Sequence, residues 1–385
     1  MKNKRNKTNK RGVALLVVLL IVMAATILSL GFLSRSNVEL ACGENMILRT
    51  QMDYLAESGL EHARGLILNP QDVNSEYWEG DARQQLVAGS NDYYDIVIVR
   101  DDPNLCNYFI TCDAYREKNG EKTGRSGLEA ELRFNPCIAY WAGLSTAISQ
   151  RITINGDVYC NGNISGSGYI GGDGFASGNI TANVEGQKNE AVAQAPISWP
   201  GLEVGNFSSS YYIGFASYSV QVIEPNISNG TFGPSESNPA GIHYCDDPNN
   251  LANLGGNVTI NGTLVVNGDL TISGINNVIS DVKNFPALLV SGEVIVENDG
   301  TLEINGLAQV GQKLVISGSA ANVYIDVVGG LFIANGSIEG AISDTVSVSV
   351  TAAPAIASIQ TWPTQGNPVR WTPAGGAFFR SIERN

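Results

Sequence analysis

The hydrophobic pattern begins with one long apolar run and its amphipathic continuation. Val13 through Leu33 form an unbroken run without a charged side chain. At about 1.5 Å of rise per residue, roughly 20 such residues cross the hydrocarbon core of a membrane as an α-helix. Residues 34–68 continue with apolar or small side chains three, four or seven apart, which is helical spacing. These are Ala41, Leu48, Met52, Leu55, Gly59, Ala63 and Leu66. The pattern predicts one helix over 13–68, with 13–33 in the membrane.

Residues 69–141 alternate between apolar and polar positions like a small antiparallel β-meander. We expect strands at 93–100, 106–116 and 126–134, with Lys118-Asn119-Gly120 in the second connection. If Arg116 faces Ser126 across the hairpin, Cys106 faces Pro136, which cannot donate to the ladder. The chain ends there are close enough for Cys106 and Cys137 to form a disulfide. Any small α+β domain would show a similar pattern.

From residue 151 the apolar positions follow a period of six. The first sixes read RITING, DVYCNG, NISGSG and YIGGDG, and the register returns later as NVTING, TLVVNG and DLTISG. The second and fourth places are mostly apolar and share one face of a strand. Asn-Gly or Ser-Gly at the last two places gives the backbone freedom that a corner needs. This predicts a Gly-rich parallel β-helix over 142–342, with three faces and about 18 residues per coil.

Two segments depart from that period. Residues 187–256 contain six prolines and a group of aromatic residues, so we expect an insertion that packs on the coil or carries a recognition surface. The tail, residues 343–385, contains Trp362 and Trp371 among prolines. We expect it to cap the open end of the β-helix. The fold class is therefore multidomain: a long helix, a small antiparallel sheet and a parallel β-helix.

Charge divides the chain into a basic start and an acidic remainder. Residues 1–12 hold six basic side chains and no acid, which keeps this leader on the cytoplasmic side of a membrane. Without those six, the formal charge of −14 becomes −20, which argues against nucleic acid as a partner. A single pass through the inner membrane then places the C-terminal bulk in the periplasm or outside the cell. Such compartments permit disulfides.

Three kinds of segment compete for this basic-to-apolar junction. A secretory signal peptide has a shorter apolar core and a small-residue cleavage site, which fits poorly here. A plain transmembrane anchor fits. A type IV prepilin signal also fits, because there a basic leader ends in Gly ahead of the apolar helix. In that case a peptidase would cut between Gly12 and Val13.

The chain resembles the PilX-type minor pilins and the related K-type pseudopilins of type II secretion over its leader and predicted long helix. The matching residues are Arg11-Gly12-Val13-Ala14-Leu15-Leu16-Val17 and Tyr54-Leu55-Ala56-Glu57-Ser58-Gly59-Leu60-Glu61-His62-Ala63. The resemblance implies cleavage by a prepilin peptidase and partners among other pilin or pseudopilin subunits. Major pilins carry Glu at the fifth mature position, where this chain has Val17. A carboxylate in a membrane needs a partner, which in pilins is the N-terminal amine of a neighbouring subunit. Val17 has no carboxylate and cannot form this pair. The resemblance then implies a minor or tip subunit, or a subunit that assembles less efficiently.

Candidate catalytic chemistry is sparse. The strand repeats resemble those of bactofilins. They also share their six-residue period with hexapeptide acyltransferases, which need a catalytic histidine near the coil. The chain has only two histidines, His62 on the predicted helix and His243 in the expected insertion. We expect His243 to pack beside Tyr244. A β-helical lyase or glycosidase needs clustered acids. Its candidates are Asp101-Asp102 and Asp246-Asp247, each before Pro-Asn, with Asp157 and Asp269 beside corners, and all read as turn residues.

We therefore predict no catalytic residue, no cofactor and no metal. Two functional classes stay open. One is a structural subunit of a type IV pilus or secretion pseudopilus. The other is a membrane-anchored surface β-helix that binds a polysaccharide or another cell, with no specific ligand predicted.

Overall fold

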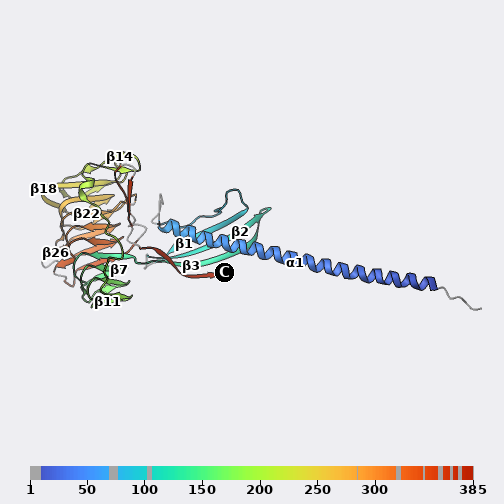
Figure 1. Ribbon diagram of the computed structural model, residues 1–385. Coiled ribbons are helices and arrows are strands. Elements are labelled where there is room, and N and C mark those ends of the chain that lie inside the picture. The colour runs from blue at the N-terminus through green and yellow to red at the C-terminus, as the bar shows by residue number, and fades with distance from the viewer. Residues whose placement is uncertain are drawn as a thin grey trace, which may run out of the picture.

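The chain forms a long helix, a small antiparallel sheet on the second half of that helix, and a parallel β-helix beyond it (Figure 1). The computed structural model describes residues 10–68, 77–101, 106–283, 285–317, 322–340, 343–353, 359–364, 367–371 and 375–384. The axis of the β-helix lies across the direction of the long helix (Figure 1). The fold class predicted from the sequence is confirmed.

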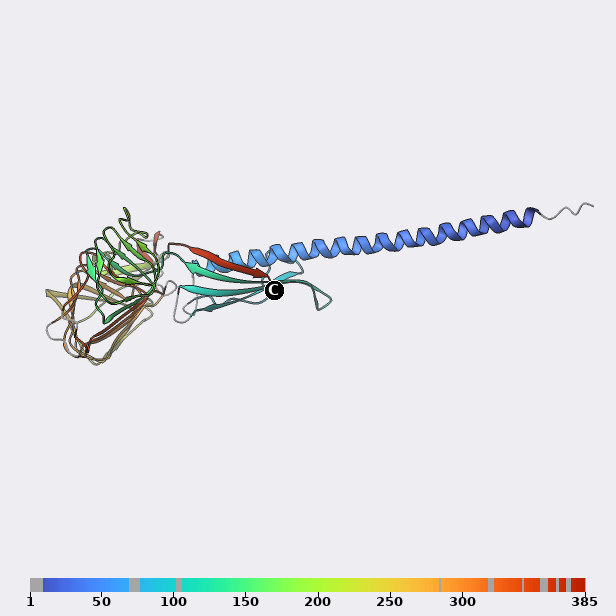
Figure 2. The ribbon, with the colours of Figure 1, turned by 90° about the horizontal axis from the view of Figure 1, so that it is seen from below.

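The helix α1 spans Lys10–Leu68, in agreement with the predicted helix. Its first half projects freely, and only its second half packs on the sheet (Figure 2). Side chains 14–47 are exposed, whereas one face of the later turns is buried. The buried apolar residues of that face are Met52, Leu55, Ala56, Leu60, Ala63 and Ile67. Ala41 is exposed and Leu66 only half-buried, so the buried stripe is narrower than the spacing suggested.

The sheet, which we call the sheet unit, has four antiparallel strands in the order β1-β2-β3-β33. They are β1 (Asp92–Arg100), β2 (Asn107–Lys118), β3 (Glu121–Phe134) and β33 (Ala377–Arg384). Asn119 and Gly120 turn the β2–β3 hairpin with φ of 55° and 81°. Two positive φ values are what a two-residue turn between twisted strands needs, and Asn-Gly adopts them readily.

The hairpin register differs from the expected one. Ala114, not Arg116, lies opposite Ser126, and the register shifts between Tyr115 and Arg116. Gly124, with φ of 56°, is the extra residue of this bulge. Cys106 therefore faces Phe134 rather than Pro136, and the Phe134 amide donates to the Cys106 carbonyl at 3.1 Å.

The β-helix is inserted into the sheet unit, between the end of β3 and the start of β33. Two short segments, 134–137 and 375–377, connect the two parts, and we call them the neck. The Asn135 amide donates to the Gly376 carbonyl, and the Gly375 amide donates to the Pro136 carbonyl, each at 2.9 Å. A Cβ at Gly375 would lie 2.5 Å from the Pro136 ring, so this close approach requires glycine.

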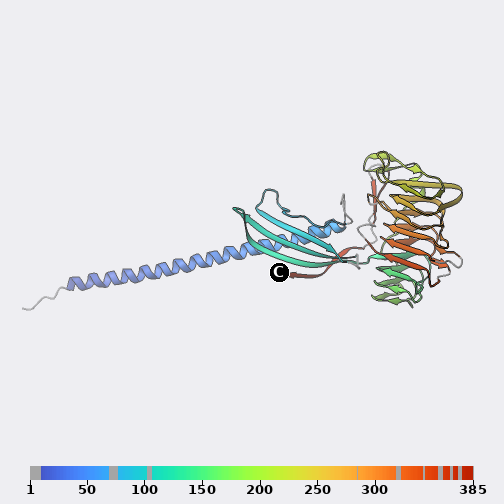
Figure 3. The same ribbon diagram turned by 180° about the vertical axis from the view of Figure 1, so that it is seen from behind.

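The β-helix consists of two stretches of chain stacked end to end (Figure 3). The first winding runs from the neck outward through β4 (Ile138–Ala142), β5 (Thr146–Ala147), β6 (Ile152–Asn155), β7 (Asp157–Cys160), β8 (Ile164–Ser165), β9 (Tyr169–Ile170), β10 (Gly174–Ala176), β11 (Asn183–Val184) and β12 (Lys188–Asn189). The second begins at the opposite end with β15 (Gln221–Val222), β16 (Asn226–Ile227), β17 (Gly230–Phe232), β18 (Ile242–Leu254), β19 (Val258–Asn261), β20 (Thr263–Ile272) and β21 (Asn277–Ser280).

The second winding continues with β22 (Leu288–Val290), β23 (Val294–Val296), β24 (Thr301–Asn305), β25 (Ala308–Val310), β26 (Leu314–Ile316), β27 (Tyr324–Val328), β28 (Leu331–Ile333), β29 (Ile338–Gly340) and β30 (Ser347–Thr351). The two windings meet where β28 pairs with β4 and β30 pairs with β6, both parallel. The last coil of the second winding thus stacks on the first coil of the first. The apolar second and fourth places of the sixes fill one continuous core.

The coils differ in length, whereas the sequence pattern predicts a constant one. In the first winding Tyr140 pairs with Val158, Val158 with Gly174 and Gly174 with Lys188, so the spacing between partners decreases from coil to coil. The first winding therefore tapers toward its free end. In the second winding Asn277 pairs with Leu302 and Leu302 with Ile325, so these coils are longer than expected. The extra residues lie in the corners, and the six-residue period holds only where the corners are short.

One corner of the second winding is built by a column of residues in left-handed backbone conformation. They are Asn229, Asn257, Asn276, Asp299 and Asn322, with φ between 49° and 61°. The Asn257 amide donates to Asn229, Asn276 to Asn257 and Asn322 to Asp299, each at 3.0 Å. Asn and Asp tolerate this conformation better than other residues with a Cβ. Their side chains then join successive coils.

A segment outside the coil, residues 190–220, returns the chain from one end of the β-helix to the other. It contains a 3-10 turn (Val204–Phe207) and the hairpin β13 (Ser210–Ile213) and β14 (Ala216–Ser219). The expected insertion 187–256 is therefore shorter, because β15 to β18 already form coils. We call residues 190–220 the crossing segment.

The crossing segment covers one face of the β-helix, which we call the covered face. Outward-pointing residues of successive strands on this face are paired in register: Tyr244, Val265, Leu289, Gln309, Phe332, Trp141, Tyr159 and Phe175. Trp199 packs on Trp141 with ring centroids 4.7 Å apart, and the Gln309 amide donates to the Leu202 carbonyl at 2.6 Å. Both sides of this face are therefore buried.

The C-terminal residues 343–385 do not form the single cap that the sequence suggested. β30 is the last strand of the second winding. β31 (Ile359–Thr364) and β32 (Asn367–Trp371) form a hairpin beside β13, where Tyr212 pairs with Trp362. β33 returns to the sheet unit and pairs with β3. The side chains of Trp362 and Trp371 lie outside the described residues.

Candidate functional site

The exposed first half of α1 is the strongest candidate for a membrane or assembly segment. Within the described part of the chain, α1 is the one helix long and apolar enough to cross a membrane, and its apolar window is wholly exposed. Leu15 is 71% exposed and Phe32 is also 71% exposed. Apolar side chains of this kind are unfavourable in water, so we expect lipid or other helices to surround them. Val17 lies in this window and offers no charge. Gly12 and Val13 lie in the first turns of α1, and their side chains are outside the described residues.

The Ala56-to-Ala63 part of α1 lies close to the sheet. A Cβ at Gly59 would overlap the Cys112 sulfur and would lie 3.1 Å from the Tyr94 ring. Glycine at this position therefore lets the backbone of α1 approach β2. His62 lies beside Gly59 on the helix, and its Nδ1 is 3.1 Å from the Tyr94 hydroxyl. The segment that carries the resemblance to minor pilins thus serves to dock the helix on its sheet.

The last strand is tied to the same part of α1 by charges. The Arg384 guanidinium lies 3.2 Å from Asp53 and 3.7 Å from Glu57. Asp53 also accepts a hydrogen bond from the Ser126 hydroxyl at 2.6 Å. These contacts link α1, β3 and β33. The end of the chain therefore helps to fix the orientation of the helix.

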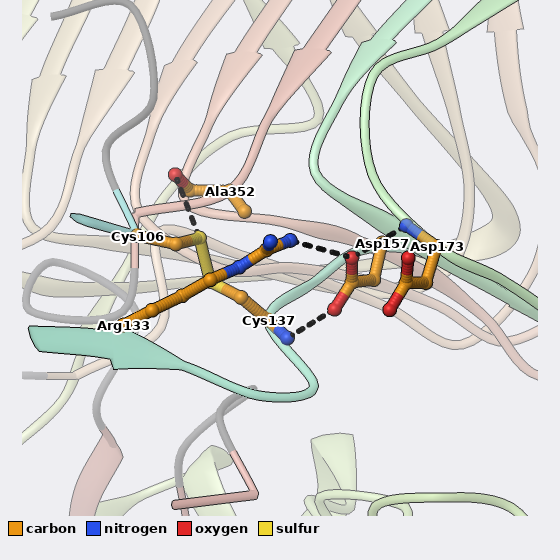
Figure 4. The surroundings of a disulfide bond; sticks show 6 residues. All are labelled: Cys106, Arg133, Cys137, Asp157, Asp173 and Ala352. Atoms are coloured by element: carbon orange, nitrogen blue, oxygen red, sulfur yellow. Dashed lines mark hydrogen bonds and ion pairs between the residues drawn. A yellow bond between two sulfur atoms is a disulfide. The ribbon is translucent and has the colours of Figure 1, made fainter. Parts of the chain in front are cut away.

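A disulfide joins Cys106 to Cys137 at the neck, and a buried carboxylate lies beside it (Figure 4). Asp157, at the start of β7, is 1% exposed. It accepts hydrogen bonds from the Cys137 amide at 2.6 Å and the Asp173 amide at 2.8 Å. Arg133 of β3 lies 3.8 Å away. Burial raises the pKa of Asp157, because removal from water disfavours its charged form, although the two amides oppose this. Asp157 thus connects the neck, the sheet unit and the first winding.

The other four cysteines form no disulfide within the described residues. Cys112, Cys160 and Cys245 are buried, and Cys42 is exposed on α1. Burial raises the pKa of Cys112 to about 12 and that of Cys160 to about 11. These two thiols stay protonated at neutral pH and are poor nucleophiles.

The structure does not bring the residues considered for enzymatic chemistry together. His62 is on α1, whereas His243 is inside the second winding. Asp246 lies in β18 and accepts a hydrogen bond from the Asn267 amide at 3.0 Å. Asp269 accepts from the Glu293 amide at 2.8 Å, an arrangement like that of Asp157 and Asp173. Asp102 and the side chain of Asp247 lie outside the described residues. Within the described ranges no group of three His, Cys, Asp or Glu side chains could hold a metal ion.

His243 is buried in the core without a hydrogen-bond partner for either ring nitrogen among the described residues. It packs edge-on against Phe232, with ring centroids 5.5 Å apart, and not beside Tyr244 as expected. Successive residues of a strand point to opposite faces, so Tyr244 faces outward when His243 faces inward.

The buried histidine should make the protein sensitive to acid. Burial lowers the pKa of His243 from 6.5 to about 4, so the folded protein excludes a proton that the unfolded chain binds. Stability from this site is fully present above about pH 6.5 and is lost as the pH falls toward 4, by at most about 3 kcal/mol. We expect the melting temperature of His243→Leu to fall less between pH 7 and pH 4.5 than that of the wild type. Equal losses, measured by circular dichroism, would assign the acid sensitivity to other groups.

Sequence reasoning missed two features of the neck. It treated Asp157 as an ordinary turn residue and did not consider Arg133. The signal for Asp157 is weak, because Asp at the start of a six also occurs at Asp269. What distinguishes Asp157 is its proximity to Cys137, which depends on the insertion of the β-helix between β3 and β33.

Comparisons with known proteins give little more. No protein-family model and no curated protein sequence matches the chain. Among solved structures, the chain is similar to the crystal structure of the competence-associated pilin ComZ from Thermus thermophilus. That match has 9% sequence identity and a TM-score of 0.28, and it covers 88% of this chain and 97% of that one. A TM-score this low does not establish a shared fold.

Proposed function

We propose that this protein is a structural minor subunit, located at the tip, of a type IV pilus or a type II secretion pseudopilus. A prepilin peptidase removes residues 1–12, and the helix from Val13 holds the subunit in the inner membrane before assembly. The same helix then packs among the helices of other pilin or pseudopilin subunits. The protein is not an enzyme, and its β-helix is displayed in the periplasm or outside the cell.

The position of the β-helix carries this proposal. It is attached at the end of the sheet unit opposite to the exposed half of α1, and it lies across the helix axis (Figures 1 and 2). Subunits of a filament repeat along an axis through head-to-tail contacts, so each internal subunit has a neighbour beyond it. A β-helix across that path obstructs a further subunit there. Such a subunit fits the end of a filament.

Val17 supports a minor role. A carboxylate at this position could pair with a neighbouring subunit's N-terminal amine inside the membrane. Val17 has no carboxylate, so this chain cannot form that pair. The same absence is compatible with the second candidate, a membrane-anchored surface β-helix that joins no filament. That candidate keeps its basic leader, because no peptidase has to act on it. The mature N-terminus therefore discriminates between the two.

Mass spectrometry of the mature protein is expected to find an N-methylated Val13 as its first residue. Gly12→Leu should abolish cleavage and leave residues 1–12 attached. Gly31→Leu is the matched control, because Gly31 lies in the same apolar segment with nothing within 4 Å of its Cβ position. It should be cleaved like the wild type. An intact leader on the wild-type protein, in cells with an active prepilin peptidase, would refute the pilin assignment and favour the anchored β-helix.

A further inference from the structure

Among the described residues, one face of the β-helix carries exposed or half-buried side chains along its centre, most of them polar. We call it the open face, formed by strands in the order β11-β9-β6-β30-β27-β24-β21-β19-β17. The outward-pointing residues at its centre form one column in register: Thr231, Thr259, Val278, Glu303, Asp326, Ser349, Thr153, Tyr169 and Asn183. All are exposed or half-buried. A parallel column contains Asn261, Ser280, Asn305, Val328, Thr351 and Asn155.

Polar outward positions are not a general property of this coil, because the covered face lacks them. Equivalent positions there are aromatic or aliphatic with one Gln, and the crossing segment packs on them. On the open face hydroxyl, amide and carboxylate groups recur from strand to strand, at the about 4.8 Å spacing of a β-sheet. This surface is a flat strip of hydrogen-bond donors and acceptors and is poorly suited to packing against an apolar protein surface.

The open face leads into a cavity of about 250 Å³ beside the neck. Its walls include Asn155, Tyr169 and Glu185 from the β-helix and Arg133 from the sheet unit, and the disulfide lies at its edge. Gly171 and Gly172 also line it, and Gly172 lies so close to the preceding coil that a Cβ there would overlap the Asp157 carboxylate. The cavity is smaller than the roughly 300–1,000 Å³ of sites for drug-sized ligands, so it suits one small ring.

The polar groups of the cavity are of mixed character. The Arg133 Nε is buried and has no hydrogen-bond partner among the described residues. Arg133 also lines the cavity and its side chain is 22% exposed, so a ligand oxygen can reach this residue there. Asp157 lies 3.8 Å from the same guanidinium, and the Tyr169 hydroxyl donates to the Glu185 carboxylate. The ring of Tyr169 is 43% exposed and offers an apolar surface.

These charges select against an anionic ligand. An anion would meet Asp157 and Glu185, with Glu303 and Asp326 further along the open face, and Arg133 already faces Asp157. A ligand with many hydroxyl groups and no net charge matches both donors and acceptors, and the Tyr169 ring can pack against the less polar face of a sugar ring.

We propose that the open face binds a neutral polysaccharide, with one terminal or branching sugar in the cavity between Tyr169, Glu185 and Arg133. This inference rests on the proposed display of the β-helix outside the cytoplasm. The glycan chain lies along the column from Thr153 toward Glu303. The subunit would then contact a glycan surface through the side of its β-helix.

The test uses the full-length protein in a zwitterionic detergent, because sugar-based detergents would compete. Cello-, malto- and N-acetylchito-hexasaccharides are titrated by calorimetry, with oligogalacturonate as the anionic comparison. At least one neutral series should bind at millimolar concentration or tighter, and oligogalacturonate should not. Tyr169→Ala and Arg133→Gln should each weaken binding about tenfold or more, and Tyr169→Phe should keep most of it because the ring remains.

Tyr54→Ala is the matched control, because Tyr54 is an exposed tyrosine on α1, outside the β-helix and its cavity. It should bind like the wild type. No binding of any neutral series, or binding of oligogalacturonate alone, would overturn the proposal, as would equal affinity in Tyr169→Ala and Tyr54→Ala. The N-terminus reports independently on the subunit assignment: a protein that begins at Val13 but binds no sugar loses only this inference.

Discussion

Replacing Val158 with aspartate is expected to unfold the β-helix. Val158 is fully buried in β7, where it points into the core of the first winding. Its strand pairs on one side with β4, next to the junction of the two windings, and on the other with β10. An aspartate there would bury a charge without a partner or would have to take up a proton. Either cost, added to the lost apolar contact, amounts to about 4 kcal/mol or more.

The matched control is Val222→Asp, the same change at a strand position of the β-helix that is 67% exposed. It should shift the melting temperature little, because the carboxylate stays in water. Thermal unfolding followed by far-ultraviolet circular dichroism compares the two variants with the wild type. If Val158→Asp melted like Val222→Asp, the side chain of residue 158 could not face a closed core.

The parts of the fold that follow from local periodicity could be predicted from the sequence. A run of uncharged residues and an amphipathic continuation define α1, and strict alternation defines β1 to β3. The sixes with apolar second and fourth places define the strands of the β-helix. In each case the information lies within a few residues of the position that is described, which is why the predicted fold class agrees with the structure.

The topology could not be predicted in the same way. The two windings have the same local pattern, so the six-residue repeats do not indicate that β28 stacks on β4. No local pattern indicates that β33 returns to β3. A direct signal for the covered face was nevertheless present. Third places in sixes such as TLVVNG, ALLVSG and DVYCNG are apolar or aromatic, whereas those in RITING, NVTING and TLEING on the open face are Thr or Glu. An outward position that is apolar in successive coils indicates that another segment covers it.

The candidate site could also be predicted only in part from the sequence. Cys106 and Cys137 could be placed near each other because both follow from one hairpin. The cavity beside them could not be found from the sequence, because Arg133 comes from the sheet unit and Tyr169 and Glu185 from later coils of the first winding. These residues meet only because the neck sets the first winding against β3. The neck is therefore the feature on which both the display of the β-helix and the proposed glycan site depend.

Removing the disulfide at the neck is expected to destabilise the sheet unit strongly. The bond joins residues 31 positions apart and encloses the β2–β3 hairpin. Closing a loop of this length in the unfolded chain accounts for about 3–4 kcal/mol of stability in the loop-entropy model. The double variant Cys106→Ala/Cys137→Ala should lose about this free energy of unfolding in urea titrations. Cys42→Ala, an exposed free cysteine on α1, is the control and should match the wild type.

The consequence should extend beyond the sheet unit, because Cys137 also donates its amide to Asp157. Once the disulfide is absent, this hydrogen bond and the two backbone hydrogen bonds of the neck hold the start of the first winding against β3. We therefore expect limited proteolysis to cut the double variant at the neck faster than the wild type, and a reducing agent to have the same effect on the wild type. Equal cleavage rates would mean that the neck does not depend on the disulfide, which would then stabilise only the hairpin.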